Sequence, residues 1–274
     1  MIIIVGSRGW IGSSLGLRLS ASGIKWMPAH ILFGNSSQTR LLDFTWTRNF
    51  IFQGSKISRI VNCAASGTSD EEHAHYLNIT KVLSYECRSN GIGYIHIGSA
   101  AEFGMNSAEF IDSFAEPNPV SKYGEIKYLA SNETLANDGF VVRPFNVVGP
   151  NQSISTPVGE WMAKIKSITD ERTLEIGNST LIRDYISLNN LTEILCELAI
   201  RPTFPRQMNI CSGIGTTFGE MLNALLLVSG IQINVYNNEI PGIPRVVGNP
   251  SELKSIGLYK TENIVDLARN ALQP

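Results

Sequence analysis

The stretch that decides the fold is Ile2-Ile3-Ile4-Val5-Gly6-Ser7-Arg8-Gly9-Trp10-Ile11-Gly12. Its four apolar residues Ile2–Val5 predict a buried strand, and Trp10–Ser20 shows the periodicity of a helix. Glycines between the two let the backbone turn tightly, and the amino end of a helix offers unpaired N–H groups and a favourable dipole to a pyrophosphate. A strand, a glycine turn and a helix in this order predict dinucleotide binding; a plain strand-turn-helix is the alternative.

Strand and helix signals continue to alternate beyond this unit. Further buried strands are expected at Arg59–Ala64, Tyr94–Gly98 and Phe140–Pro144, with helices at Asn78–Ser89 and Tyr123–Asn137. Apolar strands separated by helices indicate βαβ units, because a parallel strand can be reached only through a crossover. The sequence therefore predicts an α/β fold with a doubly wound parallel Rossmann sheet.

After Gly149-Pro150 the predicted elements become shorter and turns more frequent. Candidate helices there are Trp161–Ile168, Leu191–Ala199 and Phe218–Ser229. We therefore expect an NADP-binding Rossmann domain over residues 1–150 and a smaller C-terminal substrate-binding lobe over residues 151–274. A return of the chain between the two is left open.

Composition and charge exclude several classes of protein. Hydrophobic residues make up 43% and charged residues 17%, with a formal net charge of −2, so a nucleic-acid or membrane-surface partner is not expected. The chain has no apolar run near the roughly 20 residues that span a bilayer, and no leader precedes the glycine turn, so we expect a cytoplasmic protein. Its four cysteines are scattered without a CxxC pair, which favours free thiols and no metal site.

The charges near the glycine turn bear on the choice of cofactor. NAD-binding proteins commonly place Asp or Glu on the ribose about 20 residues after the turn. This chain has no acidic residue before Asp43, whereas Arg8 lies inside the turn, where a guanidinium could pair with a 2′-phosphate. NADP(H) is therefore predicted, with NAD still possible. The alternative is that Arg8 is a solvated loop residue.

Tyr123 and Lys127 are the candidate acid–base pair, since a spacing of four places both on one face of the predicted helix. A nearby ammonium and an oxidised nicotinamide ring would stabilise a phenolate and lower the tyrosine pKa from about 10. Tyr123 would then act as acid in reduction and as base in oxidation. Such a pair can also arise by chance on a surface helix, but Ser99 at the end of the preceding strand supplies a hydroxyl for a substrate carbonyl.

With these motifs in place, the chain resembles the extended short-chain dehydrogenase/reductase family, the NAD-dependent epimerase/dehydratase group, over nearly its whole length. The resemblance implies catalytic roles for Ser99, Tyr123 and Lys127, and a loop at the cofactor supported by Asn78. The cofactor-binding residues that it implies are Gly6, Ser7, Arg8, Gly9, Trp10, Ile11, Gly12, Asp43, Ala64, Ala65, Ser66, Tyr123 and Lys127.

The same resemblance implies a site for a nucleotide-diphosphate sugar. Arg143–Pro150 is similar to the family's RxxNxxGP segment, whose asparagine, here Asn146, lines that site. Arg183 stands in a segment that resembles the family's Arg-Asp-Tyr motif, where the arginine grips the diphosphate. Arg245 is a candidate second diphosphate ligand, with a surface arginine as the alternative. A homodimer is also implied by the resemblance alone.

Departures from the family pattern reduce the number of reactions that we expect this chain to catalyse. Family 4,6-dehydratases carry an Asp-Glu pair where this chain has Ala100-Ala101, so dehydration is not expected. Glu102 is expected to face away from the site, and His96, on an apolar strand, to be a core histidine.

The leading interpretation is an NADPH-dependent 4-ketoreductase acting on a nucleotide-linked 4-keto-6-deoxysugar. A nucleotide-sugar 4-epimerase with tightly bound NAD is the runner-up, followed by a non-catalytic NADP-binding regulator. The nucleotide, the sugar and the product stereochemistry are left open.

Overall fold

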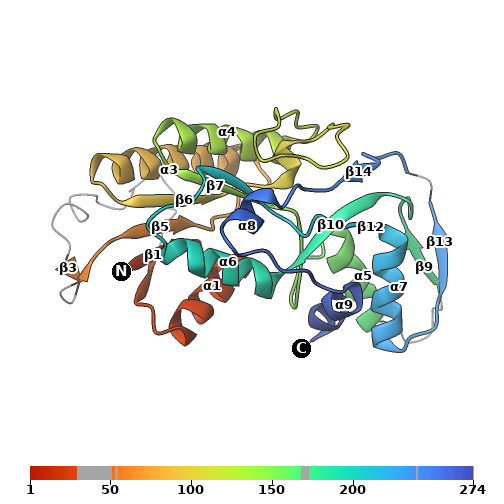
Figure 1. Ribbon diagram of the computed structural model, residues 1–274. Helices are drawn as coiled ribbons and strands as arrows, with labels where there is room; N and C mark the ends of the chain where they lie inside the picture. The colour runs from red at the N-terminus through yellow and green to blue at the C-terminus, as the bar shows by residue number, and fades with distance from the viewer. Residues whose placement is uncertain (30–50, 53–54, 168–172, 239, 274) are drawn as a thin grey trace. The chain divides into compact units, whose positions relative to one another are not determined.

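A computed structural model describes residues 1–29, 51–52, 55–167, 173–238 and 240–273, and it contains two compact units (Figure 1). Unit 1 comprises Met1–Gly104, Glu116–Arg143 and Thr192–Met208, and unit 2 comprises Met105–Ala115, Pro144–Leu191 and Asn209–Pro274. The chain therefore passes repeatedly from one unit to the other, and a single boundary after residue 150 does not describe this division.

Unit 1 is built on a six-stranded sheet with the order β11-β7-β6-β5-β1-β2. Neighbouring strands from β2 to β7 pair in parallel. Figure 1 shows helices α3 and α4 together on one side of this sheet, and α1 and α6 on the other. The predicted doubly wound α/β fold is thereby confirmed. The strands are β1 (Ile2–Val5), β2 (Trp26–Ala29), β5 (Arg59–Asn62), β6 (Gly93–Ile97), β7 (Phe140–Pro144) and β11 (Gln207–Ile210); the helices are α1 (Trp10–Ala21), α3 (Asp70–Ser89), α4 (Lys122–Ala136) and α6 (Leu188–Ile200).

The central strands β1, β5, β6 and β7 are almost completely buried because helices cover both faces of the sheet. Ile4, Val5, Val61 and Ile95 are completely buried. This continuous burial is typical of parallel sheets and explains why their strands are recognisable in the sequence.

Unit 2 has its own sheet, in which β10 lies between β12 and β14 and also pairs in parallel with β8. A separate pair, β9 and β13, and the packed helices α7 and α9 complete a core that includes Trp161, Leu174 and Leu225. The elements are β8 (Asn146–Val148), β9 (Thr173–Ile176), β10 (Ile182–Ser187), β12 (Gly215–Thr217), β13 (Asn234–Asn237), β14 (Arg245–Val246), α5 (Pro157–Ser167), α7 (Phe218–Ser229), α8 (Ser251–Ser255) and α9 (Ile264–Leu272). The remaining elements are β3 (Ile51–Phe52), β4 (Ser55–Lys56) and the 3-10 turn η1 (Ala100–Glu102).

Three helices differ from the sequence prediction, and one of them, α5, begins at Pro157 rather than at Trp161. Helix α3 begins at Asp70, eight residues before the predicted start at Asn78, because Ser69 and Glu72 form a capping box that satisfies its first N–H groups. The helix predicted at Leu191–Ala199 in the second lobe is α6, most of which belongs to unit 1. Within the described part of the chain, no helix is long and apolar enough to cross a membrane.

Candidate active site

The glycine turn after β1 has the geometry of a phosphate cradle. Gly6 has φ +74°, and a Cβ there would lie 2.7 Å from the Ala64 nitrogen; a Cβ on Gly12 would collide with the Gly6 carbonyl oxygen. Helix α1 starts after Gly9, which has no side chain to cap it, and its first turn holds no acidic residue. The first N–H groups of α1 are therefore presented to an anion, so the turn fits the diphosphate of a dinucleotide.

The other candidate cofactor residues in and beyond this turn differ in exposure. Arg8 is exposed, while Ser7, Trp10 and Ile11 are half-buried. Asp43 lies outside the described residues.

The loop after β5 packs directly against Gly6. Its support comes from Asn62, whose side-chain oxygen accepts a hydrogen bond from the Ala64 N–H at 3.1 Å. Asn78, implied in this role by the resemblance, is exposed on α3. In the same loop Ala65 is exposed and Ser66 is buried.

Ser99 is fixed where β6 ends and η1 begins. Its hydroxyl oxygen accepts a hydrogen bond from the Ala101 N–H at 3.1 Å, and its own N–H donates to the Glu102 carboxylate at 2.8 Å. Glu102 is completely buried and touches the backbone of Ser99, so the expectation that it faces away is wrong. A carboxylate three residues after a serine satisfies the backbone at the start of the turn, which holds Ser99 in place.

Tyr123 reaches Ser99 because the start of α4 packs closely on η1. A Cβ on Gly124 would collide with the Ala101 carbonyl oxygen, so glycine permits this approach. Tyr123 is 46% exposed, and its phenol lies near enough to the Ser99 side chain for that hydroxyl to influence its pKa. Desolvation raises the pKa of Tyr123, and Glu102 raises it further, while the Ser99 hydroxyl opposes this rise.

The side chain of Lys127 is buried inside unit 1. It is 5% exposed, and its Nζ donates to the Tyr76 hydroxyl oxygen at 2.9 Å and to the Ile97 carbonyl oxygen at 3.0 Å. Burial lowers the pKa of Lys127 to about 8, with Glu102 opposing the shift. The ammonium lies 6.0 Å from the Tyr123 ring centre. In contrast to the sequence-based expectation, the chain's own groups raise the pKa of Tyr123 rather than lower it, because desolvation is the largest effect.

The candidate substrate residues lie on the sheet of unit 2. Asn146 donates from its side chain to the Asp184 carbonyl oxygen at 3.0 Å. The Arg183 guanidinium donates to the carbonyl oxygens of Ile182 and Ile243 and lies 5.2 Å from the Phe218 ring. The Arg245 Nε donates to the Glu109 carbonyl oxygen at 3.0 Å.

The register of the strands places Arg183 and Arg245 on opposite faces of the sheet. Arg183 pairs with Val246 and Ile182 pairs with Arg245, and aligned residues of parallel strands share a face. Consistent with this, a Cβ on Gly215 would meet both the Arg245 guanidinium and the Ile182 side chain. Asn146 pairs with Tyr185, which lies two residues from Arg183. Asn146 and Arg183 therefore share one face of the sheet, and Arg245 projects from the other.

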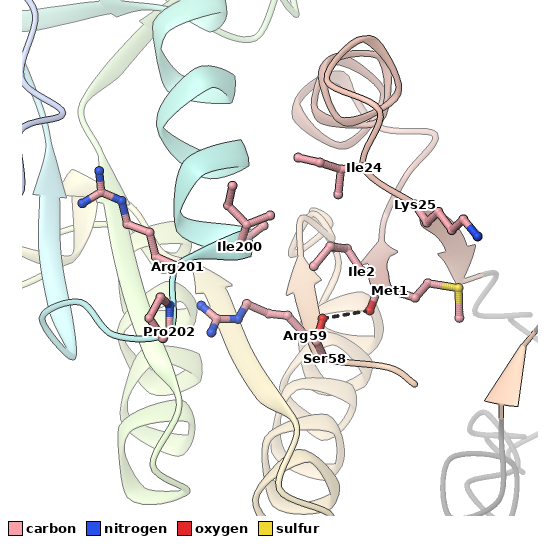
Figure 2. A pocket seen from close by; sticks show the side chains of 10 residues that line it. Met1, Ile2, Ile24, Lys25, Ser58, Arg59, Ile200, Arg201 and Pro202 are labelled. Carbon is pink, nitrogen blue, oxygen red and sulfur yellow. Dashed lines mark hydrogen bonds between the residues drawn. The ribbon is translucent and has the colours of Figure 1, made fainter. Parts of the chain in front are cut away.

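A pocket of about 390 Å³ lies at the opposite, amino-terminal edge of the sheet of unit 1 (Figure 2). Arg59 lines it and donates to the Leu198 carbonyl oxygen near the end of α6 at 2.7 Å. The guanidinium also lies over the rings of Phe140 and Phe204. Because ligands of open α/β sheets bind at the carboxyl ends of the strands, where the glycine turn and Ser99 lie, this pocket is not the candidate active site.

Comparison with known proteins identifies the family to which the chain belongs. A sequence profile described as "NAD dependent epimerase/dehydratase family" matches residues 2–211. The chain belongs to this family. It is an NAD(P)-dependent enzyme of the extended short-chain dehydrogenase/reductase type, within a family that modifies nucleotide sugars, and the resemblance identified from the sequence is confirmed.

Individual relatives illustrate the range of the family. The chain is 28% identical over 173 residues to a GDP-6-deoxy-D-talose 4-dehydrogenase from Aggregatibacter actinomycetemcomitans; the match covers 60% of this chain and 58% of that enzyme. RMD from Pseudomonas aeruginosa, solved with NADPH, has a TM-score of 0.79 at 18% identity, covering 99% of this chain and 97% of the other. Thermus thermophilus UDP-glucose 4-epimerase, solved with NAD, has a TM-score of 0.77 at 18% identity and the same coverage. A nicotinamide dinucleotide cofactor follows from the family.

Sequence reasoning missed three residues that shape this site. Tyr76 binds the candidate lysine, Glu102 binds the backbone of Ser99, and Gly124 lets α4 approach η1. Ser99 and Glu102 have the spacing of a capping box, and this pattern could have indicated that Glu102 binds the backbone of Ser99. Nothing in the spacing of Tyr76 and Lys127, 51 residues apart, indicates their contact.

Proposed function

We propose that this enzyme reduces the 4-keto group of a nucleotide-linked 4-keto-6-deoxyhexose with NADPH. The observation that carries the proposal is the packing of the start of α4 on η1, which places Tyr123 near Ser99 and one helical turn from a buried Lys127. These groups lie at the same carboxyl edge of the sheet as the glycine turn. The name of the relative from Aggregatibacter, a 4-dehydrogenase of a GDP-linked 6-deoxysugar, favours chemistry at carbon 4.

The residues of the site divide the reaction between them. Ser99 and Tyr123 would hydrogen-bond the keto oxygen and polarise the carbonyl. Tyr123 would then give its phenolic proton to that oxygen, while NADPH supplies the hydride that the carbon gains. The raised pKa of Tyr123 keeps the phenol protonated before transfer, which suits an acid in the reductive direction. The Lys127 ammonium, fixed by Tyr76 and Ile97, would stabilise the phenolate left behind.

Cofactor preference and substrate binding are assigned to three residues. Arg8 is exposed in the glycine turn, where its guanidinium could pair with the 2′-phosphate of NADPH. Asn146 and Arg183 share a face of the sheet in unit 2, so they are the proposed contacts to the nucleotide-diphosphate sugar. Arg245 projects from the other face and is not assigned a diphosphate contact with them.

The competing function is a nucleotide-sugar 4-epimerase, supported by the fold shared with UDP-glucose 4-epimerase. Both reactions use a serine, a tyrosine and a lysine, so the distinction lies in the fate of the hydride. The test incubates the enzyme with GDP-, UDP-, dTDP- and CDP-linked 4-keto-6-deoxyhexoses and NADPH. A reductase oxidises one NADPH for each sugar converted. Conversion of 4-hydroxy nucleotide sugars into their C4 epimers without net change in the cofactor would overturn the proposal in favour of an epimerase.

A further inference from the structure

Behind the candidate active site, three buried side chains form a chain of hydrogen bonds that begins at Lys127. The Lys127 Nζ donates to the Tyr76 hydroxyl oxygen at 2.9 Å, and the Tyr76 hydroxyl lies 3.3 Å from Nε2 of His96. Tyr76 is 3% exposed and His96 is completely buried. The three residues come from α4, α3 and β6, so tertiary packing alone brings them together.

The direction of these hydrogen bonds follows from the groups involved. An ammonium only donates, so the Tyr76 oxygen must accept from Lys127. The Tyr76 proton is then free to be donated, and Nε2 of His96 is the acceptor within reach. With this direction, His96 is neutral and carries its proton on Nδ1, an atom that has no hydrogen-bond partner among the described residues. Burial, together with the charges of Lys127 and Arg143, lowers the pKa of His96 well below its ordinary value, which agrees with a neutral ring.

These hydrogen bonds fix the side chain of Lys127, which would otherwise be flexible. A lysine loses up to about 2 kcal/mol of rotamer entropy when it is ordered, so its charge is placed accurately only if contacts hold it. Tyr76 and Ile97 use two of the three N–H groups of Lys127, and the Tyr76 ring centre lies 4.9 Å from the ammonium. One N–H then remains without an acceptor in the part of the chain that the structure describes.

We propose that Tyr76 is a positioning residue for Lys127: its hydroxyl, oriented by His96, holds the ammonium in place and in its charged form. This inference rests on the proposed function, since it concerns the lysine of that site. The other titratable groups around Lys127 are Glu102 on η1, Cys63 after β5 and Tyr123 on α4. None of these provides the hydrogen bond that Tyr76 gives, so removal of the Tyr76 hydroxyl should make the ammonium easier to deprotonate.

The test compares Tyr76→Phe with Tyr94→Phe. Tyr94 is the matched control, because it is a buried tyrosine of the same unit whose hydroxyl is bound by Asn62 and not by Lys127. Lysine labelled with ¹³C and ¹⁵N allows the side-chain signal of Lys127 to be titrated by NMR, assigned by its loss in Lys127→Met. Tyr76→Phe should move this titration to lower pH by roughly one unit, the equivalent of a hydrogen bond to a charged group. Tyr94→Phe should leave it in place.

Enzyme assays supply the second measurement. In Tyr76→Phe, the pH at which kcat/KM falls on the basic side should move in the same direction as the Lys127 titration, with Tyr94→Phe unchanged. If Tyr76→Phe does not fold, His96→Leu should produce a smaller shift of the same sign, because it removes the acceptor that orients the Tyr76 hydroxyl. An unchanged Lys127 titration in the folded variant overturns the inference. The NMR result does not require turnover, so it stands apart from a failure of the proposed reaction.

Discussion

Glu102 and Arg143 form a buried ion pair, with 2.7 Å between the Glu102 carboxylate and the Arg143 Nε, and with both side chains almost inaccessible to solvent. The second oxygen of Glu102 accepts hydrogen bonds from the Ser99 N–H and the Ser131 hydroxyl. Gly98 makes room for this carboxylate, since a Cβ there would collide with it. One buried charge therefore ties β7 and α4 to the turn that carries Ser99.

Breaking this pair should destabilise the protein strongly. Glu102→Leu leaves the buried Arg143 charge uncompensated, which costs about 3–5 kcal/mol in comparable cases. The double variant Glu102→Leu/Arg143→Met removes both charges and should recover much of that loss. Urea unfolding of the two single variants and the double variant measures the coupling. Strictly additive losses would show that the pair acts as two independent residues.

Arg8 should determine the preference for NADPH. Arg8→Ser removes the only arginine inside the glycine turn and should weaken NADPH binding by roughly 10- to 100-fold, the equivalent of one or two charge-assisted hydrogen bonds. NADH binding should change little, because it has no 2′-phosphate. Lys25→Ala, an exposed cation outside the turn, is the control. Titration of dinucleotide fluorescence gives the dissociation constants, and an equal loss for both dinucleotides would remove the assignment.

The two arginines of unit 2 should behave differently. Arg183→Gln should raise KM for the nucleotide sugar by roughly 10- to 100-fold, since a guanidinium that shares a face with Asn146 is the proposed diphosphate ligand. Arg245→Gln should change KM by about threefold at most, because Arg245 projects from the other face. Steady-state kinetics of both variants test this assignment. A larger effect of Arg245→Gln would reverse it.

Burial of Lys127 should also appear in the pH dependence of stability. Its pKa is about 8 in the folded protein and 10.5 as the ordinary value, so between these pH values the unfolded chain binds more protons at this site. The contribution of Lys127 to stability therefore increases with pH in this window, by up to about 1.4 kcal/mol per pH unit. The free energy of unfolding of the wild type minus that of Lys127→Met should become more positive as the pH rises through the window. A constant difference would mean that Lys127 titrates normally.

The sequence predicted four of the six strands of the Rossmann sheet, and β2 and β11 were not among them. Strands such as Ile2–Val5 and Phe140–Pro144 agree with the structure because strands buried on both faces are continuous apolar runs. Ser99 and Tyr123 follow from local motifs, and in the structure the Ser99 hydroxyl lies near enough to Tyr123 to lower its pKa.

What the sequence could not provide depends on packing between distant segments. The environment of Lys127 is set by Tyr76 on another helix, and the faces of Arg183 and Arg245 depend on how β10 pairs with β14. The pKa of Tyr123 was expected to fall, but desolvation, which sequence spacing does not reveal, raises it. The division into units differs from a single boundary because α6 and part of β11 return to unit 1.

The central claim is that Tyr123 donates the proton during carbonyl reduction, and Tyr123→Phe tests it most directly. The measurement pairs kcat for reduction of the nucleotide-linked 4-keto sugar with the dissociation constant for NADPH. Loss of a general acid predicts a fall in kcat of roughly 100-fold or more, with NADPH binding nearly unchanged. Undiminished turnover by the phenylalanine variant would contradict the account.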